Sequence, residues 1–348
     1  MKITTVLGTR PEIIRLSKTI KMIDGIIGAG NHFIFWTGQN QDPLLSDVFF
    51  EEFGLRQPDI KLRPGQTFTS QIADMFPIFD QHLREFAPNK VLILGDTNSS
   101  LLAIVAARLA IPVYHIEAGN RTGGPRYAEE INRIIIDHVS DVHLCYNERS
   151  RANLLREGIP IHRTFVVGNP IHEMIDSSNP RYASSNPYIL VTLHRQENVD
   201  SKPRLSMIAQ GLRSLSGYEL RLCLHPRTRD RMREFGVGFP GVDHGPVGWR
   251  KFISLLYNAS CVITDSGTVE EEASYLGTPC IVARVAQERY REMEFGGIVM
   301  DMNFDDVSVR AAIETTTVIS DRPMSKNASK SIVSILLGVN HTHSYGLP

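Results

Sequence analysis

The sequence predicts an α/β fold of two consecutive doubly wound domains, each a parallel β-sheet covered by helices on both faces. Short β-branched apolar runs alternate with longer helical patterns, which is typical of parallel sheets buried on both sides. The chain has 348 residues, enough for two domains. A segment rich in Ser, Asn and Pro, residues 176–187, interrupts the alternation, which then restarts.

The first half contains five expected strands. They are Ile3–Leu7, Phe33–Thr37, Val91–Leu94, Val113–Ile116 and Val142–Cys145. Helical patterns lie between them, starting at Pro11 and covering Ser100–Leu109 and Glu129–Val139. We therefore assign residues 1–175 to an N-terminal Rossmann-like domain and residues 176–187 to a linker.

The second half repeats this pattern. Its expected strands are Ile189–Leu193, Leu220–Leu224, Val262–Thr264 and Cys280–Ala283, and its expected helices are Pro203–Leu215, Lys251–Asn258 and Val269–Leu276. We assign residues 188–324 to a C-terminal Rossmann-like domain. Residues 325–348 form a last helix, Ser325–Leu337, and a tail, and the sequence leaves open whether they pack back on the first domain.

Composition excludes several classes of function. Hydrophobic residues make up 42% of the chain, charged residues 22%, and the formal net charge is -1. A near-neutral chain has no general attraction to nucleic acid or anionic membranes. The longest apolar stretch, Leu101–Tyr114, contains Arg108 and Pro112, so we expect no membrane span. We likewise expect no signal peptide, because the apolar run at the N-terminus is short.

The four cysteines form no C-x-x-C pair and lie within or at the start of apolar runs: Cys145, Cys223, Cys261 and Cys280. This placement favours buried thiols in a reducing compartment over the alternative, a metal or redox site. We therefore expect no bound metal.

Polar clusters follow several strands of the first half, where ligands bind in such sheets. Arg10 follows the first strand and suits a phosphate, although an ion pair with Glu12 explains it equally well. Asp96 follows the third strand, where a helix N-cap is the structural alternative. Glu117 follows the fourth, and two neighbouring carboxylates suggest proton transfer or binding of hydroxyl groups.

The helix after Glu117 carries three charged residues, Glu129, Arg133 and Asp137, on one face at i, i+4 spacing. For a single E-x-x-x-R pattern, a solvated face with salt bridges is the commoner explanation.

Two further clusters lie in the second half. His194 and Arg195 follow a strand and suit a phosphate together with proton transfer, and a structural role is as well supported. A strand also leads into Ser266, Gly267 and Thr268, so that a helix N-terminus is available for an anion. The remaining candidates are Glu272, for ribose hydroxyls, and Arg289, after the last apolar strand.

Ten motifs in order resemble one family. They are GTRPE, TGQ, GDT, EAG-x-R, EE-x-NR, VGN, VT-x-HR-x-EN, TDSG, EEA-x-x-LG-x-P and ER, spread from Gly8 to Arg289. Their order closely resembles that of the non-hydrolysing UDP-N-acetylglucosamine 2-epimerases. The resemblance implies two Rossmann-like domains of the glycosyltransferase-B type that face a central cleft, with no cofactor. It also implies a cytoplasmic homodimer that makes activated N-acetylmannosamine-type sugars for surface polysaccharides.

The resemblance also implies roles for individual residues. The catalytic positions correspond to Asp96, Glu117, Glu129 and His194, and the UDP-binding positions to Arg10, Ser266, Glu272 and Arg289. Arg133 matches the arginine of the E-x-x-NR segment, and Arg15 stands where many members have Lys. The implied reaction eliminates UDP to give a 2-acetamidoglycal and adds it back after carbon 2 has been inverted.

Some residues depart from the family pattern. Asn40, Asn120 and Thr268 look more like relatives that act on UDP-2-acetamido-2,6-dideoxyhexoses or UDP-diacetamido-uronic acids, and Ala128 and Tyr290 replace prolines. The sugar is therefore less closely defined than the reaction. A hydrolysing epimerase, a glycosyltransferase on the same scaffold and a nucleotide-sugar binder without activity are the alternatives.

Overall fold

The chain folds into two compact units, each built around its own β-sheet. The computed structural model describes residues 1–39, 47–121, 128–178, 187–215, 217–284, 297–301 and 327–338. Unit 1 comprises Met1–Met174 and Ser325–Pro348, and unit 2 comprises Ile175–Met324.

The sheet of unit 1 is parallel throughout. Its strands are β1 (Ile3–Leu7), β2 (His32–Trp36), β3 (Ile60–Lys61), β4 (Lys90–Leu94), β5 (Val113–Ile116), β6 (Val142–Cys145) and β7 (Thr164–Val166). They lie in the order β3-β2-β1-β4-β5-β6-β7. The direction of winding reverses between β1 and β4, which is where doubly wound sheets bind ligands.

Helices cover this sheet. They are α1 (Arg10–Ile27), α2 (Asp47–Glu52), α3 (Phe68–Phe86), α4 (Ala103–Arg108), α5 (Ala128–Val139), α6 (Glu148–Arg156), α7 (Pro170–Ser178) and α14 (Ala328–Leu337). Helix α1 begins at a capping box, in which Thr9 and Glu12 satisfy the free N–H groups of the first turn. Pro11 suits this first turn because its missing N–H has no intrahelical partner there.

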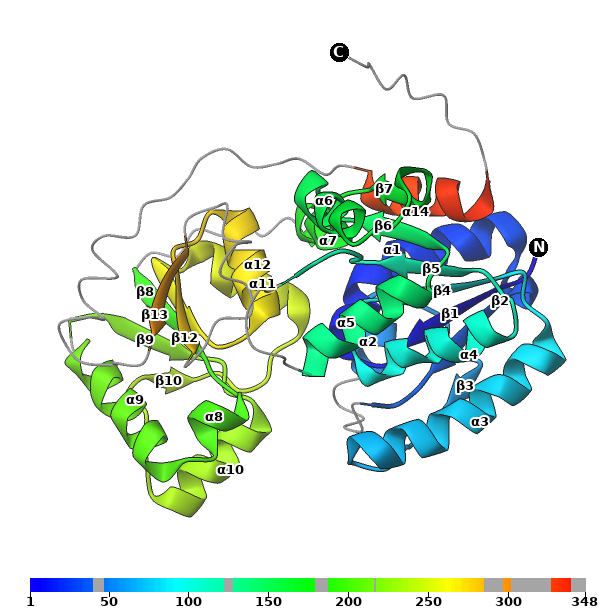
Figure 1. Ribbon diagram of the computed structural model, residues 1–348. Helices are drawn as coiled ribbons and strands as arrows, with labels where there is room; N and C mark the ends of the chain where they lie inside the picture. Colours follow the sequence, from blue (N-terminus) through cyan, green and yellow to red (C-terminus); the bar gives the residue numbers. More distant parts are fainter. Residues whose placement is uncertain are drawn as a thin grey trace, which may run out of the picture. The chain divides into compact units, whose positions relative to one another are not determined.

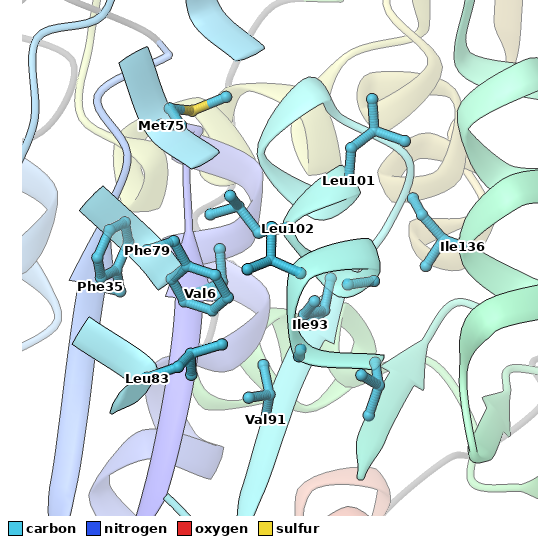
Figure 2. Close-up of a cluster of buried hydrophobic side chains, with 14 residues drawn as sticks. Val6, Phe35, Met75, Phe79, Leu83, Val91, Ile93, Leu101, Leu102 and Ile136 are labelled. Carbon is cyan, nitrogen blue, oxygen red and sulfur yellow. The ribbon is translucent and has the colours of Figure 1, made fainter. Parts of the chain in front are cut away.

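One hydrophobic core of unit 1 lies between the sheet and α3. Helix α3 turns Met75, Phe79 and Leu83 toward the sheet at a spacing of four residues, and all three are buried. Figure 2 shows Phe79 beside Phe35 of β2, and the two rings meet edge to face with 4.9 Å between centroids. This packing fixes the sheet whose carboxyl ends carry the polar residues.

Unit 2 repeats the winding of unit 1. Its strands are β8 (Tyr188–Thr192), β9 (Glu219–Leu222), β10 (Val242–Asp243), β11 (Cys261–Thr264), β12 (Cys280–Arg284) and β13 (Gly297–Asp301), in the parallel order β10-β9-β8-β11-β12-β13. Its helices are α8 (Gln196–Val199), α9 (Lys202–Ser214), α10 (Pro226–Phe235), α11 (Trp249–Asn258) and α12 (Gly267–Leu276). The reversal lies between β8 and β11.

The last helix of the chain returns to unit 1. Helix α14 packs against α1, beside which it is drawn in red in Figure 1. Ile332 and Leu336 of α14 are fully buried. The backbone N–H of Ser329 donates to Glu173 at 3.0 Å, and the ammonium of Lys90 donates to the carbonyl of Leu336.

The predicted fold class, two parallel-sheet α/β units, is confirmed, and so is each of the nine strands expected from sequence, with shifts of one or two residues at their ends. Two expectations were wrong in detail. The first turn of the helix expected at Ser100 belongs to a 3-10 helix, Asn98–Leu102, and α4 begins only at Ala103. The first residues of the linker expected at 176–187 belong instead to α7, which continues to Ser178. Residues 179–186 lie outside the described part of the chain.

Candidate functional site

The candidate residues of unit 1 follow the strands next to the reversal of the sheet. Arg10 follows β1, Asp96 follows β4 and Glu117 follows β5. Because these strands are parallel neighbours, their carboxyl ends meet at one edge of the sheet. A Cβ atom built on Gly95 would lie 3.6 Å from Oε2 of Glu117, so the Glu117 carboxylate lies against the turn that carries Asp96.

Glu117 is held in an uncommon backbone conformation. Its φ of +71° lies in the left-handed region, which costs a residue with a side chain about 1–3 kcal/mol. The surroundings impose this conformation. Its backbone N–H donates to Leu144 at 3.0 Å, and its carboxylate accepts from Nη1 of Arg15 at 2.7 Å and from Tyr146 at 3.3 Å. Such strain gathers where function needs a side chain at a fixed place.

The ion pair between Arg15 and Glu117 is almost fully buried, with 4% and 3% of the two side chains exposed. Removing one partner of a buried pair leaves an uncompensated charge and costs about 3–5 kcal/mol. Arg15 therefore holds the carboxylate in place and balances its charge.

Asp96 is held by α5. Arg133 forms an ion pair with its carboxylate through Nη2, and Asn132 donates to its backbone carbonyl at 2.9 Å. Arg133 also binds Glu130 at 2.6 Å and is buried. The expectation of a solvated salt-bridge face on this helix was wrong, because Arg133 and Asp137 are buried and bind partners on other elements.

Glu129 lies one helical turn before Arg133, at the start of α5, and is exposed. Within the described part of the chain, its side chain makes no hydrogen bond or ion pair. The structure thus brings the Asp96 turn and Glu117 together and leaves the carboxylate of Glu129 open to solvent.

Glu12 belongs to the same edge of the sheet. Its buried carboxylate accepts from the backbone N–H of Gly8 and from the backbone and hydroxyl of Thr9. Burial raises the pKa of this carboxyl to about 7, although hydrogen bonds from Gly8, Thr97 and Thr9 oppose the rise. Arg10, at the start of α1, lies over the ring of Phe49, with 5.4 Å between its guanidinium carbon and the ring centroid.

In unit 2 a buried aspartate organises the strand ends. Asp265 follows β11, is fully buried, and accepts from the backbone N–H groups of His194 at 3.0 Å and Arg195 at 2.9 Å. Asn198 donates to the same carboxylate at 2.9 Å and to Ala283 at 2.7 Å. The Asp265 carboxylate therefore joins the turns after β8 and β11, and Asn198 connects them to β12.

His194 lies next to the buried Asp265 carboxylate and is partly exposed. Its Nδ1 lies 3.4 Å from Oδ1 of Asp265, while 41% of its side chain remains exposed. A partly exposed imidazole with a buried carboxylate beside one nitrogen suits contact with an anion or transfer of a proton. The side chain of Arg195, next in the chain, is 27% exposed.

The turn after β11 leads into α12, with Ser266 as its N-cap and Gly267 and Thr268 in its first turn. Within the described part of the chain, the Ser266 side chain makes no capping hydrogen bond. The backbone N–H groups of the first turn and the positive end of the helix dipole are therefore available for a phosphate.

Glu272 lies deeper than its expected role suggests. Its side chain is 2% exposed, and Oε1 accepts from the indole of Trp249 at 2.8 Å. Trp249 therefore fixes the orientation of this carboxylate. Arg289 lies outside the described residues.

The sequence did not identify several residues that support this arrangement through hydrogen bonds. They are Asp265, Asn198, Tyr146, and the pair of His115 and Asp137. Asp265 was visible in the TDSG motif directly after a strand, and a buried carboxylate at such a point needs partners. Asn198 stands in the VT-x-HR-x-EN motif and Asp137 on the charged face of its helix, but neither pattern indicates a partner. Tyr146 and His115 gave no signal, because their contacts join segments that are distant in sequence.

Within the described part of the chain, no helix is both long and apolar enough to cross a bilayer, and no group of His, Cys, Asp and Glu side chains has the arrangement of a metal site. The four cysteines are free and buried, as expected, and burial raises the pKa of Cys145 and Cys261 to about 12. Thiols of this kind are poor nucleophiles.

Comparisons with known proteins identify the family of this chain. The family described as UDP-N-acetylglucosamine 2-epimerase matches residues 29–337. The UDP-N-acetylglucosamine 2-epimerase of Methanocaldococcus jannaschii is 37% identical over 86% of this chain and 88% of its own. The UDP-2,3-diacetamido-2,3-dideoxy-D-glucuronate 2-epimerase of Pseudomonas aeruginosa is 35% identical over 90% of this chain and 91% of its own.

A solved structure shows the same relationship. The M. jannaschii enzyme in complex with UDP-GlcNAc and UDP is 34% identical, covers 97% of this chain and 100% of its own, and superposes with a TM-score of 0.86. A family match over most of the sequence and relatives above 30% identity along nearly the whole length lead to one conclusion. The chain belongs to the UDP-N-acetylglucosamine 2-epimerase family.

Proposed function

We propose that this protein is a non-hydrolysing UDP-N-acetylglucosamine 2-epimerase, an isomerase that interconverts UDP-GlcNAc and UDP-ManNAc. The observation that carries the proposal is the strained, buried Glu117 carboxylate, held by Arg15 against the turn of Asp96. Family membership supplies the substrate class. The charged side chains supply what the reaction requires.

The chemistry explains why two kinds of site are needed. The hydrogen on carbon 2 of the sugar is barely acidic, so removing it directly would leave an unstabilised carbanion. When the bond between carbon 1 and UDP loosens first, positive charge develops at carbon 1 and acidifies the hydrogen on carbon 2. The enzyme then needs cations and N–H donors for the diphosphate and carboxylates near carbon 2.

In the forward step a carboxylate takes the proton from carbon 2. The electrons of that C–H bond form the double bond between carbons 1 and 2, and the electrons of the C–O bond leave with UDP. In the return step an acid delivers a proton to the opposite face of carbon 2, while a UDP oxygen attacks carbon 1. The intermediates are UDP and a 2-acetamidoglycal, and no redox cofactor is required.

We assign the sugar to the carboxylates of unit 1: Asp96, Glu117 and Glu129. In unit 2 we assign the diphosphate to His194, Arg195, Arg289 and the N-terminus of α12 at Ser266, Gly267 and Thr268. In unit 1 we assign Arg10 to phosphate binding, as the family resemblance implies. Glu272 suits the ribose hydroxyls. Arg15 and Arg133 support the substrate site by holding Glu117 and Asp96.

A related sugar is the second candidate. Asn120, which departs from the family pattern, is buried and places its amide 3.4 Å from Oε1 of Glu117. A relative named as a diacetamido-glucuronate epimerase is nearly as similar as the first one given above. A UDP-diacetamido-uronic acid or a UDP-2-acetamido-2,6-dideoxyhexose therefore belongs in every substrate test.

We also propose a cytoplasmic homodimer that serves the synthesis of surface polysaccharide. Four buried free thiols suit a reducing compartment, and UDP-sugars are the donors from which such polymers are built. Light scattering on the purified protein tests the oligomeric state, and a mass near that of one chain would contradict the dimer.

A substrate panel tests the proposed reaction. The protein is incubated separately with UDP-GlcNAc, its 6-deoxy form and a UDP-diacetamido-uronic acid, and the products are followed by NMR. We expect a C2 epimer that is still linked to UDP. The same equilibrium mixture should form when the reaction starts from that epimer. Free N-acetylmannosamine with stoichiometric UDP would indicate the hydrolysing reaction instead. Binding without any product would leave only the nucleotide-sugar binder.

A further inference from the structure

Asp137 and His115 form a buried pair in unit 1. Within the described part of the chain, neither side chain forms a hydrogen bond with the carboxylate of Asp96 or Glu117, but both contact the turns that carry these residues. Asp137 of α5 is fully buried and uses both carboxylate oxygens. Oδ1 lies 2.8 Å from Nδ1 of His115, and Oδ2 accepts from Arg121 at 2.7 Å and from the backbone N–H of Gly119 at 3.1 Å. Burial alone raises the pKa of Asp137, but the charges and hydrogen bonds of His115 and Arg121 outweigh burial and lower it to about 2.

His115 connects Asp137 to the turn after β4. Its side chain is fully buried in β5, and Nε2 lies 2.9 Å from the carbonyl oxygen of Gly95. A carbonyl oxygen only accepts, so Nε2 donates to it. His115 therefore spans from Asp137 on the helix to the end of the neighbouring strand.

The pair of Asp137 and His115 contacts two turns, one carrying Asp96 and the other carrying Glu117. Gly95 directly precedes Asp96, and Gly119 lies two residues after Glu117. Both glycines have positive φ, +76° and +81°. A Cβ on Gly119 would lie 2.1 Å from the carbonyl oxygen of Ser150, so this turn passes the α6 backbone too closely for any side chain.

We infer that the pair of Asp137 and His115 is a positioning device that fixes the turn of Asp96 and the turn of Glu117 relative to each other. The inference rests on the proposed function, because it assumes that both carboxylates act on one sugar. Asp137 holds the Glu117 turn through Gly119, and His115 holds the Asp96 turn through Gly95. A shared anchor keeps the spacing between two acids constant while the proton is moved.

The same sheet contains a matched control at its other end. His32 is the first residue of β2, so it lies at the amino edge of the parallel sheet. It is buried, its Nδ1 lies 2.7 Å from Asp24, and its Nε2 lies 2.8 Å from the hydroxyl of Thr5. Asp24 also binds an arginine, Arg56, as Asp137 binds Arg121. The side-chain types are the same, although Asp24 is 21% exposed where Asp137 is fully buried, and no candidate catalytic residue is attached.

The experiment compares His115→Gln and Asp137→Asn with His32→Gln and Asp24→Asn in the full-length protein. Melting temperature and circular dichroism report folding, and kcat and KM are measured for the substrate found in the panel. A displacement of about 1 Å costs a reaction on the order of 100-fold, so we expect kcat of the His115 and Asp137 variants to fall by that order. We expect KM to change little, because the loss falls on the transition state.

The control variants should lose melting temperature without losing kcat. Should Asp137→Asn fail to fold, His115→Gln decides the question, because its amide still occupies the space between Asp137 and Gly95. Folded His115 and Asp137 variants with kcat within about twofold of wild type would overturn the inference, as would an equal loss of kcat in the controls. A wild-type protein that epimerises no sugar in the panel would instead overturn the proposed function.

Discussion

Two residues at the carboxyl edge of unit 1 show how burial and pairing give neighbouring carboxyls different properties. Glu117 is buried against an arginine, and Glu12 is buried among backbone N–H and hydroxyl donors. A full opposite charge stabilises a carboxylate more than neutral donors do. The two residues therefore support different predictions.

The first prediction concerns the acidic side chains proposed to move the proton. Glu117→Gln and Asp96→Asn keep the shape of each side chain but remove its ability to accept or deliver a proton. General acid–base groups contribute about 100- to 10,000-fold, so we expect kcat to fall by that order while UDP still binds. Glu173→Gln is the control, because Glu173 is buried in the same unit and pairs with Lys18 away from these turns. A near-normal kcat for either variant would remove that residue from the mechanism.

The second prediction concerns stability and pH. The pKa of Glu12 is raised from 4.5 to about 7 in the folded protein. Its contribution to stability is therefore fully present below pH 4.5 and is lost as the pH rises through 7. The loss amounts to about 3 kcal/mol. Glu12→Gln has no such dependence, so urea unfolding should show its stability rising relative to wild type between pH 5 and pH 8. Parallel curves for the two proteins would contradict the raised pKa.

For single residues, the sequence indicated where polar side chains lie along the strands better than it indicated which side chains they contact. Asp96, Glu117 and His194 were predicted as site residues because each comes shortly after an apolar strand, a pattern that is local in sequence, and their roles remain predictions. The pairing of Asp137 with His115 was not found, because it depends on how closely α5 approaches β5. Arg133 was assigned to a solvated face because its true partner, Asp96, lies 37 positions away in the chain.

Among the elements, α3 is a long helix that was not among those expected from the sequence. It has 19 residues, covers one face of the sheet and contains Pro77 in its middle. Proline removes one helical hydrogen bond. Pro77 is exposed, so that position of the helix faces solvent. On a solvent-facing side of a helix, a carbonyl that proline leaves without a helical partner is accessible to water.

Helix α14 shows the opposite case, an element whose local pattern was clear and whose place was left open. It follows unit 2 in the chain and packs on α1 of unit 1. Two buried apolar side chains and the contact between Ser329 and Glu173 hold it there. Periodicity defines a helix, but it does not say which surface the apolar face will meet.

The third prediction follows from this packing. Ile332 is fully buried in α14, and replacing a buried Ile by Ala costs about 2–5 kcal/mol. We expect Ile332→Ala to speed hydrogen exchange in peptides of unit 1, including α1, and to leave unit 2 protected. Ile208→Ala, equally buried in the core of unit 2, should give the reverse pattern. Faster exchange confined to unit 2 in Ile332→Ala would contradict the assignment of α14.

For the whole molecule, the repetition of one winding order is the central fact. Both units run 3-2-1-4-5-6 from the first strand of each, and both place their candidate residues where that order reverses. The alternation of strands and helices predicted this fold class, because an apolar run of four or five residues can be recognised from the local sequence alone. The two-residue strands β3 and β10 were not predicted, because they are too short to form a pattern.

The fourth prediction distinguishes the two units by pH. Burial lowers the pKa of His82 and of His172, both in unit 1, to about 4. Their contribution to stability is present above pH 6.5 and is lost as the pH falls toward 4. Glu12 acts in the opposite direction, so the test uses the Glu12→Gln variant. Hydrogen exchange at pH 7 and pH 5, corrected for intrinsic rates, should show unit 1 losing a few kcal/mol; no change in unit 1 would contradict neutral buried histidines.

Turnover in heavy water tests the proposed reaction most directly. If carboxylates of this chain remove and return the proton at carbon 2, each molecule of epimerised product carries one deuterium there. Mass spectrometry and NMR of the product formed from UDP-GlcNAc, or from the sugar that the panel identifies, measure this. One deuterium at carbon 2 is the expected result. An inverted product that keeps its original hydrogen would contradict the elimination and leave Asp96, Glu117 and Glu129 without the role proposed for them.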